Sequence, residues 1–424
     1  LYIICCAGFS SCTDSDFNVV THDIASIYHQ DLIVEERAIR DESIQFWENK
    51  LNDNKSNIVY LKKLASLYAE RFRVRGEITD LKSSNEILES LADDYPEDVS
   101  ILHQMAANLI SMHQFKDAEL YIQKALAVGE NKYASTLLQI DIMLEIGLFE
   151  EAREVLEALN DKGRFDEQIR WVKLLDAEGD LDHAIEMMEA ALHSARSMNN
   201  PELITWSLSN LADMYGHQGQ IQKSYNTHLK ALSNDPSAIH SIKAIGWIAY
   251  SHDKDLEKAK SIWSGLYELD HSPALELLLA EIYEFQGDAR MAKKLRDHAE
   301  DRIKNAEYGN MYGSQIIELT LSKRPDIAHK IATKDLSQRQ HPTSYSYMAL
   351  TESQKGNHQK AETLIKNHVL NRTSEPMAIY NAAVVLQQAQ NEKLAKELFT
   401  DCIDASFELG PSISKDVQKR LGSL

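Results

Sequence analysis

Histidine, cysteine and arginine are the side chains with which this chain could do chemistry, and most of them are scattered. His22 and His29 are two helical turns apart, so they could share one face of a helix and begin a metal site. No third ligand is near them, whereas a zinc site needs three or four ligands. The chain also lacks a glycine-rich phosphate loop, a paired-histidine zinc helix and a nucleophile elbow. We therefore predict no metal, no cofactor and no catalytic residues, and hence a protein that is not an enzyme.

The net charge of the chain restricts the classes of partner that it can bind. The chain has 65 acidic and 45 basic residues and a formal net charge of -20. Such a surface repels phosphate backbones, so we predict no nucleic-acid partner. One short basic cluster, Arg71, Arg73 and Arg75, has two interpretations. It could hold an acidic partner or a lipid head group, or it could be a surface loop paired to local carboxylates; so acidic a chain favours the second.

The first eleven residues differ from the rest. They carry no charge and are apolar or small, as at the end of a secretory signal (residues 1–11). The residues from Phe9 to Cys12 resemble the signal box of bacterial lipoproteins, although Phe9 stands where leucine is usual. The resemblance implies cleavage before Cys12, a lipid on its sulfur and a membrane-anchored protein with a tether over residues 12–20. The alternative is a buried N-terminal strand or helix with an incidental cysteine.

The signal interpretation also accounts for the cysteines. Cys5 and Cys6 would leave with the signal and Cys12 would be acylated, so only Cys402 would remain and no disulfide could form. Cys402 lies in an apolar helical segment, where a small buried thiol is the expected role.

Helical periodicity runs along nearly the whole chain, and the helices recur at a fixed spacing. A small residue opens the second helix of each successive pair, and these residues are about 34 positions apart, the period of a helix-turn-helix repeat. They are Ser84, Ala118, Ala152, Ala184, Ser224, Ala259, Ala292, Ala328, Ala361 and Ala395. Before them, glycines mark the turns (Gly147, Gly179, Gly219, Gly287, Gly356) and alanines mark the helix crossings (Ala106, Ala212, Ala280, Ala349, Ala383).

The pattern resembles the tetratricopeptide repeat (TPR) family, most clearly between Trp206 and Pro236. The resemblance implies an all-α solenoid of about ten helix-turn-helix repeats, over residues 57–200 and 201–408, with a bend near residues 197–201. Amphipathic segments at residues 21–56 and 409–424 are predicted to be capping helices, which solenoids need because their terminal repeats otherwise expose an apolar face.

The resemblance also implies a function, that of an interaction scaffold. Such arrays bind peptides or protein segments on a concave surface made by the first helix of each pair. With Cys12 lipidated, the scaffold would be anchored to the outer membrane of a bacterial envelope, facing the periplasm or the cell surface. The alternatives are a carbohydrate- or nutrient-binding outer-membrane lipoprotein, a cytoplasmic adaptor if the N-terminus is not a signal, and an enzyme with an unrecognised site. Short connections between helices count against the first of these.

The repeat register predicts an acidic groove in the middle repeats. Seven of ten charged groove positions are acids: Asp141, Glu145, Asp166, Lys173, Asp176, Asp213, His217, Lys243, Glu281 and Glu284. The same register adds aromatic side chains and a histidine: Trp206, His240, Trp247 and Tyr250. Aromatic rings among carboxylates suit a basic or amphipathic segment, bound in a salt-sensitive way across residues 206–285. The alternative is that the acidity only keeps the protein soluble.

Overall fold

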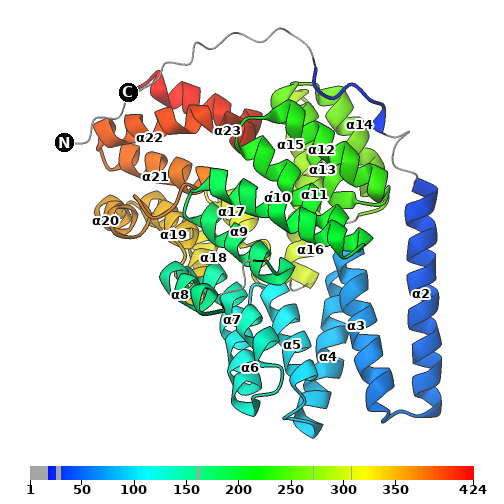
Figure 1. Cartoon of the computed structure of the whole chain (residues 1–424). Coiled ribbons are helices and arrows are strands. Elements are labelled where there is room, and N and C mark those ends of the chain that lie inside the picture. Colours follow the sequence, from blue (N-terminus) through cyan, green and yellow to red (C-terminus); the bar gives the residue numbers. More distant parts are fainter. Residues whose placement is uncertain (1–17, 25–29, 160–162, 271, 307) are drawn as a thin grey trace.

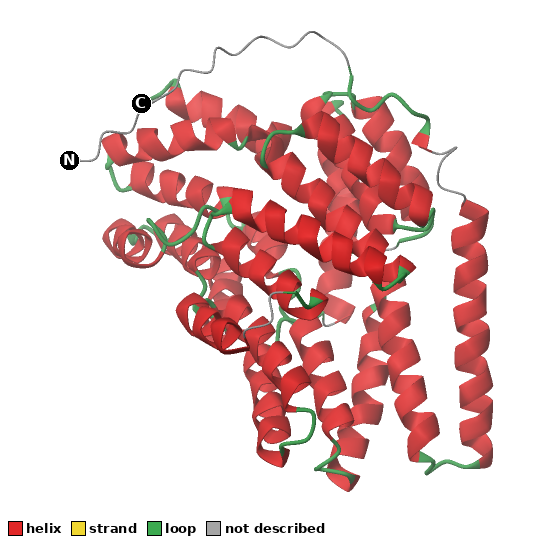
Figure 2. Ribbon diagram, viewed as in Figure 1, coloured by secondary structure: helices red, strands yellow, loops and turns green. Residues whose placement is uncertain are grey.

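The computed structural model describes residues 18–24, 30–159, 163–270, 272–306 and 308–424. Helices are the only regular secondary structure in these ranges (Figure 2). In chain order they are α2 (Gln30–Asp53), α3 (Ile58–Arg75), α4 (Ile78–Asp94), α5 (Val99–Ser111), α6 (Phe115–Val128), α7 (Lys132–Ile146), α8 (Phe149–Leu159), α9 (Phe165–Ala177), α10 (Leu181–Ser197), α11 (Pro201–His217), α12 (Ile221–Asn234), α13 (Ile239–Trp247), the π-helical turn η1 (Ile248–His252), α14 (Leu256–Tyr267), α15 (Pro273–Phe285), α16 (Ala289–Ala306), α17 (Gly313–Thr320), α18 (Pro325–Gln338), α19 (Pro342–Gln354), α20 (His358–His368), α21 (Pro376–Gln388), α22 (Glu392–Asp404) and α23 (Ser406–Leu421).

The helices from α3 to α22 form ten consecutive antiparallel pairs, which confirms the prediction of an all-α, TPR-like solenoid (Figure 1). The small residue predicted to open each second helix is buried in all ten pairs, from Ser84 in α4 to Ala395 in α22. The alanines predicted at the crossings, among them Ala212 and Ala280, are fully buried as well. Because these side chains are small, the two backbones of a pair approach closely and the larger apolar side chains fill the space around them.

Local sequence sets the helix ends. The predicted turn glycines adopt a left-handed backbone conformation, with φ of 85° at Gly147 and 83° at Gly179, which disfavours any residue with a Cβ. Proline occupies the first turn of several helices, where its missing N–H costs no hydrogen bond, as at Pro201 and Pro376. The Asp98 and Asn57 side chains accept hydrogen bonds from the free N–H groups at the starts of α5 and α3.

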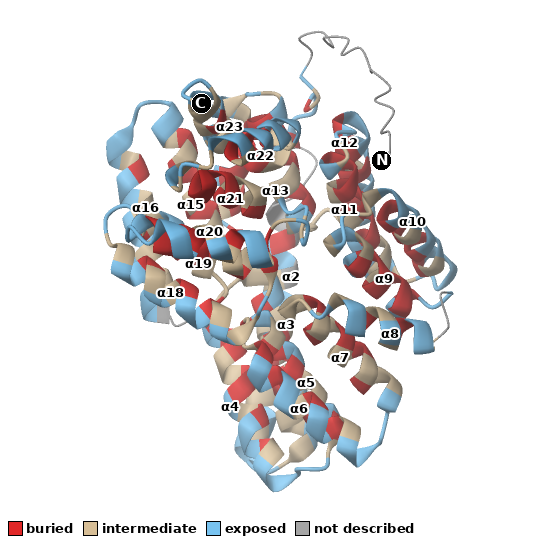
Figure 3. Cartoon of the chain, turned by 90° about the vertical axis from the view of Figure 1, so that its left-hand side faces the viewer, coloured by how far each residue is buried: buried red, intermediate tan, exposed pale blue. Residues whose placement is uncertain are grey.

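The array makes contact with itself after between five and six repeats. The Asn310 amide contacts the carbonyl of His113, 197 residues earlier in the chain. Further along, Gly147 lies against His341, Gly179 against Ser374 and Gly216 against Phe407, each at a similar separation in sequence. In Figure 3, α8–α12 and α18–α23 accordingly rise side by side as two columns above α4–α6. We call this line of contacts the seam; it makes the array a closed body, because distant repeats touch as well as adjacent ones.

Both ends of the described chain contact the middle of the array. The backbone N–H groups of Val19 and Val20 donate to the Asp253 carboxylate at 2.9 and 2.8 Å, and Val20 is fully buried. The described end of the predicted tether is therefore held against η1 and α14. At the other end, α23 bends at Gly410, and Trp247 and Ser251 donate hydrogen bonds to the Phe407 carbonyl at 3.0 and 2.6 Å.

The hydrophobic core continues through the position at which a bend was predicted. One cluster joins residues of α9 and α10, such as Phe165 and Met188, to Leu208 and Tyr215 of α11. The wider spacing between Ala184 and Ser224 comes from two long helices, because α10 and α11 each have 17 residues. In the described part of the chain, no helix combines the length and the apolar character that a bilayer crossing requires.

The crossing alanines give a direct test of the repeat. Replacing the fully buried Ala280 with leucine forces a larger side chain between α15 and its neighbours, so we expect Ala280→Leu to lower the free energy of unfolding by about 1–3 kcal/mol. Denaturant titration measures this change, and hydrogen exchange should rise first in α13–α16.

The matched control is Ala190→Leu, at an exposed position within α10, which should change stability by less than about 0.5 kcal/mol. Equal losses in the two variants would contradict the assignment of Ala280 to a helix crossing.

Candidate functional site

The interior of the array contains two adjoining cavities. The larger, of about 640 Å³, lies between α11–α15 and the C-terminal part of the chain. The second, of about 440 Å³, extends along the seam and shares His217, Glu375 and Glu408 with the first. Together they form the central chamber, whose walls come from both columns. The chamber occupies the inner side of the first helices, where the groove was predicted. The second column forms its opposite side.

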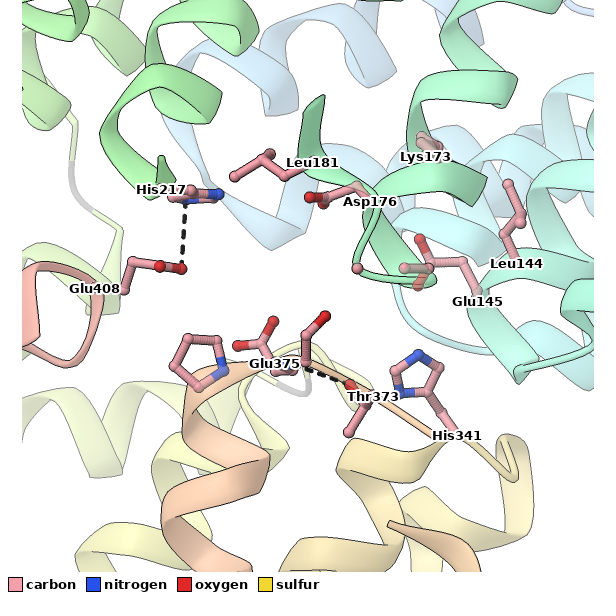
Figure 4. A pocket seen from close by; sticks show the side chains of 14 residues that line it. Leu144, Glu145, Lys173, Asp176, Leu181, His217, His341, Thr373, Glu375 and Glu408 are labelled. Atoms are coloured by element: carbon pink, nitrogen blue, oxygen red, sulfur yellow. Dashed lines mark hydrogen bonds and ion pairs between the residues drawn. The ribbon is translucent and has the colours of Figure 1, made fainter. Parts of the chain in front are cut away.

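Three carboxylates from different elements line the second cavity (Figure 4). Asp176 comes from α9, Glu375 precedes α21, and Glu408 lies at the start of α23. Burial raises the pKa of all three carboxyls, and the charge of Asp176 raises the pKa of Glu375 further. His217 lies 3.9 Å from Glu408 and is the nearest basic group. Asp176 and Glu375 are exposed and Glu408 is half-buried, so all three side chains keep contact with water, while the protein around them displaces part of their hydration.

Two further carboxylates, Glu281 of α15 and Glu318 of α17, line the larger cavity. Each accepts a hydrogen bond from a tyrosine hydroxyl, Glu281 from Tyr250 at 2.7 Å and Glu318 from Tyr347 at 2.5 Å. Burial raises the pKa of both carboxyls despite these bonds. Among the described residues, neither forms an ion pair with lysine or arginine.

Asp213 joins two histidines at the edge of the larger cavity. Its carboxylate lies 2.5 Å from Nε2 of His240 and 3.4 Å from Nε2 of His228. Burial opposes the charge on Asp213, but the contacts with the two histidines outweigh burial and hold the pKa of its carboxyl well below the usual range. The bond to Asp213 raises the pKa of His240, whereas burial lowers that of His228. We infer an Asp213 carboxylate that pairs with the more exposed His240 and accepts a hydrogen bond from neutral His228.

These residues continue into a chain that has the composition of a catalytic triad. Nδ1 of His228 lies 3.2 Å from the hydroxyl of Ser241, which in turn lies 2.9 Å from the hydroxyl of Ser209. Ser241 is fully buried, however, so no substrate carbonyl can reach its oxygen. The arrangement therefore satisfies buried polar groups and offers no accessible nucleophile.

One part of the wall of the larger cavity is apolar and aromatic. Trp247, Leu277 and Leu278 line it and are partly exposed to the cavity. Behind Trp247 lie the buried rings of Tyr250 and Trp263, with centroids 5.6 and 6.4 Å from that of Trp247. The chamber thus combines a rigid apolar surface with carboxylates, which suits a ligand that carries both apolar and cationic groups.

Most of the predicted groove residues come together in this chamber. Six line the larger cavity: Asp213, His217, His240, Lys243, Trp247 and Glu281. Glu145, Lys173 and Asp176 line the second. Lys173 lies 3.3 Å from Asp141, which also binds Arg170, so Asp141 is already neutralised. Burial lowers the pKa of Lys243.

Five predicted residues line neither cavity: Asp141, Asp166, Trp206, Tyr250 and Glu284. Tyr250 was expected on the open surface, but it is fully buried behind Trp247, because the π-helical turn η1 rotates it away from the cavity. Glu284 is exposed and pairs with Arg296. Trp206 is 38% exposed and packs edge-on against Phe165, outside both cavities.

The sequence analysis missed Glu318 of α17, which lies one repeat after Glu281, and three residues of the second column: Glu375, Phe407 and Glu408. No signal in the repeat pattern identifies these three, because they become neighbours of the first column only through the seam. The register placed nine of its fourteen groove residues in the chamber, since residues on one face of a helix stay on that face whatever the tertiary arrangement.

Several other predictions concern the N-terminal part. Residues 1–11, Cys12 and His29 lie outside the described residues. His22 contacts the hydroxyl of Tyr225 at 2.9 Å, and the described residues include no group of histidine, cysteine or acidic side chains arranged to hold a metal ion. The basic cluster pairs locally as expected, since Arg71 binds Asp41 and Asp80, but it lies within α3 and not in a loop. Cys402 is buried as predicted.

Comparison with known proteins gives likeness in fold only. Neither the models of protein families nor the curated proteins include a match to this chain. Among solved structures, a human IFIT1 dimer with PPP-AAAA is 15% identical, with a TM-score of 0.45 over 88% of each chain. A Rap protein complexed with competence and sporulation factor is 14% identical, with a TM-score of 0.44 over 76% of this chain and 99% of that one. Yeast Tom70 is 13% identical, with a TM-score of 0.32 over 94% of this chain and 95% of that one. Likeness at this level carries no inference about ligands.

The pairing of Asp213 with His240 predicts a pH-dependent contribution to stability. Asp213, with its lowered pKa, stabilises the fold above the ordinary carboxyl pKa of about 3.9, and this is lost as the pH falls through the lowered value. His240, with its raised pKa, stabilises the fold below about pH 6.5, and this is lost as the pH rises through the raised value. We therefore expect Asp213→Asn to cost about 1–3 kcal/mol at about pH 6 and less at about pH 9.

Urea unfolding at both pH values measures the difference. Asp301→Asn, at an exposed position within α16, is the control and should have little effect at either pH. A loss for Asp213→Asn that is the same at both pH values would show that the charge pair is not the cause.

Proposed function

We propose that this chain is a non-enzymatic interaction scaffold that takes a basic, amphipathic segment of a partner protein into its central chamber. One observation carries the proposal. Five carboxylates face the chamber without a lysine or arginine partner among the described residues: Asp176, Glu281, Glu318, Glu375 and Glu408. Carboxylates in partly dehydrated surroundings gain more from a cation than exposed ones do, because water screens their charge less.

The apolar wall narrows the class of ligand. Leu277, Leu278 and Trp247 offer a surface for an apolar side chain beside Glu281, which follows Leu277 by one turn of α15. A cavity of about 640 Å³ has room for a few side chains and not for a folded domain. A short segment in which a leucine or aromatic residue lies beside lysine or arginine fits both surfaces. The absence of a nucleic-acid partner stays a prediction.

We also propose that the scaffold is anchored to a bacterial envelope membrane through Cys12, as its likeness to a lipoprotein signal box suggests. The contact of Val19 and Val20 with Asp253 indicates which side of the anchored array would face the membrane. Because Asn18 follows Cys12 by six positions, the Cα atom of Cys12 would lie within about 21 Å of that of Asn18. The side of the array formed by η1 and α14 would then be nearest the membrane.

Binding of a designed probe tests the chamber. A fluorescent peptide of alternating lysine and leucine should bind the wild-type protein and lose affinity as salt is added, because ions screen the charges. Its counterpart with aspartate in place of lysine should not bind. Glu281→Gln combined with Glu318→Gln should weaken binding by more than about 1 kcal/mol, measured by fluorescence anisotropy.

The matched control combines Glu154→Gln with Glu397→Gln, two exposed positions outside the chamber. A further variant, Trp206→Ala, tests the path of the bound segment outside the chamber. Trp206 lies on the same face of α11 as Asp213, so a segment that leaves the chamber along α11 would contact Trp206. Phe46→Ala, at a 52% exposed aromatic residue of α2, is its control. Peptide affinity that does not change with salt concentration, or equal affinities in the neutralised and control proteins, would exclude the chamber as the binding site.

The anchor has its own test. Expressed in bacteria with its complete signal, the protein should partition into detergent and incorporate a fatty-acid analogue, and Cys12→Ala should abolish both. Cys402→Ala is the control, because Cys402 is a buried thiol in α22 that no lipid-transferring enzyme can reach. A wild-type protein that stays in the aqueous phase would exclude the anchor and favour a cytoplasmic adaptor.

A further inference from the structure

Residues 18–24 of this chain lie in a groove between the second helices α12 and α14 (Figure 1). Lys258 of α14 donates a hydrogen bond to the carbonyl of Val20. The hydroxyl of Tyr225 in α12 accepts a hydrogen bond from the backbone N–H of His22 at 3.2 Å. The Val20 side chain is fully buried, in the same hydrophobic cluster as Tyr225. The array thus binds a short segment of polypeptide between two second helices, through its backbone and an apolar side chain.

The corresponding groove one repeat earlier, between α10 and α12, is a cavity of about 600 Å³ with α11 beneath it. We call it the α10–α12 groove. The repeat register relates the two grooves, because Lys223 and Lys258 each come one position before the small residue of their helix. Four residues of α12 that line the α10–α12 groove have the same repeat positions as four residues of α14 beside residues 18–24. In order, Gln222, Lys223, Asn226 and Thr227 correspond to Glu257, Lys258, Ser261 and Ile262. The lysine that binds the backbone of residues 18–24 therefore has a counterpart, Lys223, in the α10–α12 groove.

The α10–α12 groove differs in charge from the chain as a whole. It has three exposed basic side chains, Arg196, Lys223 and Lys230, and one acidic side chain, Glu189. Helix α12 contains no acidic residue, although the chain has 65 acids and 45 bases. Lys223 lies 3.9 Å from Glu189, whereas Arg196 and Lys230 form no ion pair with another described residue. The groove is therefore a basic site on an acidic protein.

The floor of the groove is apolar. It consists of buried side chains of α10 and α11: Leu192, Leu208, Leu211 and Tyr215. The Lys223 ammonium lies 3.7 Å from the centroid of the Tyr215 ring, so a cationic group stands directly beside this floor. In an extended segment, successive side chains point to opposite sides. A segment that places one apolar side chain on the floor therefore directs the next side chains outward, toward the exposed basic groups.

We propose that the α10–α12 groove is a second binding site, which takes an extended segment of a partner protein in which apolar and acidic residues alternate. An apolar side chain of the segment lies on the floor, and Lys223 donates to a backbone carbonyl, as Lys258 does to Val20. Carboxylates on either side pair with Arg196 and Lys230. The groove shares no lining residue with the two cavities of the central chamber, so the proposal does not depend on the chamber ligand.

A fluorescent peptide of alternating glutamate and valine tests the groove by fluorescence anisotropy. The full-length protein should bind it. Arg196→Gln combined with Lys230→Gln should weaken binding by about tenfold or more, because two carboxylates of the peptide lose their partners. The same variant should bind the lysine–leucine peptide as wild type does, which separates this site from the chamber. The matched control combines Lys124→Gln with Lys393→Gln, at exposed positions of α6 and α22, and should bind both peptides normally.

A substitution that fills the groove without changing its charge distinguishes binding in the groove from general attraction to basic side chains. Asn226→Trp should weaken binding of the glutamate–valine peptide severalfold, whereas Gln123→Trp, at an exposed position of α6, should not. A photoreactive group on the peptide should cross-link to α10–α12.

Three results would overturn the assignment. The first is equal peptide affinity in the groove variants and their controls. The second is cross-linking confined to α14, which would show that the peptide has displaced residues 18–24. The third is binding of a single-stranded oligonucleotide, weakened by the same variants, without binding of the peptide; the groove would then be a nucleic-acid site.

Discussion

Every helix pair of this protein depends on one steric condition, a side chain no larger than that of alanine or serine where its two helices cross. These residues, from Ser84 to Ala395, are buried in all ten pairs. The condition fixes how closely the helices approach and therefore how each pair is oriented relative to the next. Since it recurs at nearly the same spacing, similar rotations accumulate along the chain. The curvature of the whole array is the sum of these local crossings.

The accumulated curvature is tight enough for the chain to meet itself. Gly147, Gly179 and Gly216 of the first column contact residues about 195 positions later. Repeat arrays are ordinarily stabilised by contacts between neighbours alone, so local damage stays local. Here the seam, α23 and the segment around Val20 add contacts between distant repeats. The open concave surface expected of such an array becomes a half-open chamber with walls from both columns.

Enclosure changes the chemistry of the side chains that line the chamber. The same carboxylates on an open surface would be fully hydrated and screened by salt. Within the chamber, the surrounding protein raises the pKa of Asp176, Glu318 and Glu375 although all three side chains keep contact with water, so their charges gain more from a cationic ligand. Asp213 is the contrasting case, because His228 and His240 stabilise its charge. Ser241, in the same network, is fully buried, and its hydroxyl contacts His228 and Ser209.

The sequence by itself determined the helices, their pairing and the face on which each residue lies. The buried residues Ala118 and Ala212 and the left-handed Gly147 could be identified because period and residue type are local properties. The predicted part of the chamber wall, including Asp176, Asp213 and Glu281, followed from the same register. Tyr250 departs from it because a single π-helical turn shifts the residues within it. Glu318 of α17 lies in the repeat that follows that of Glu281 in α15, so the two meet through a contact between neighbouring repeats. Only the tertiary structure brought Glu375 and Glu408 to Asp176. Their position depends on a small rotation summed over between five and six repeats, and no short stretch of sequence encodes that sum.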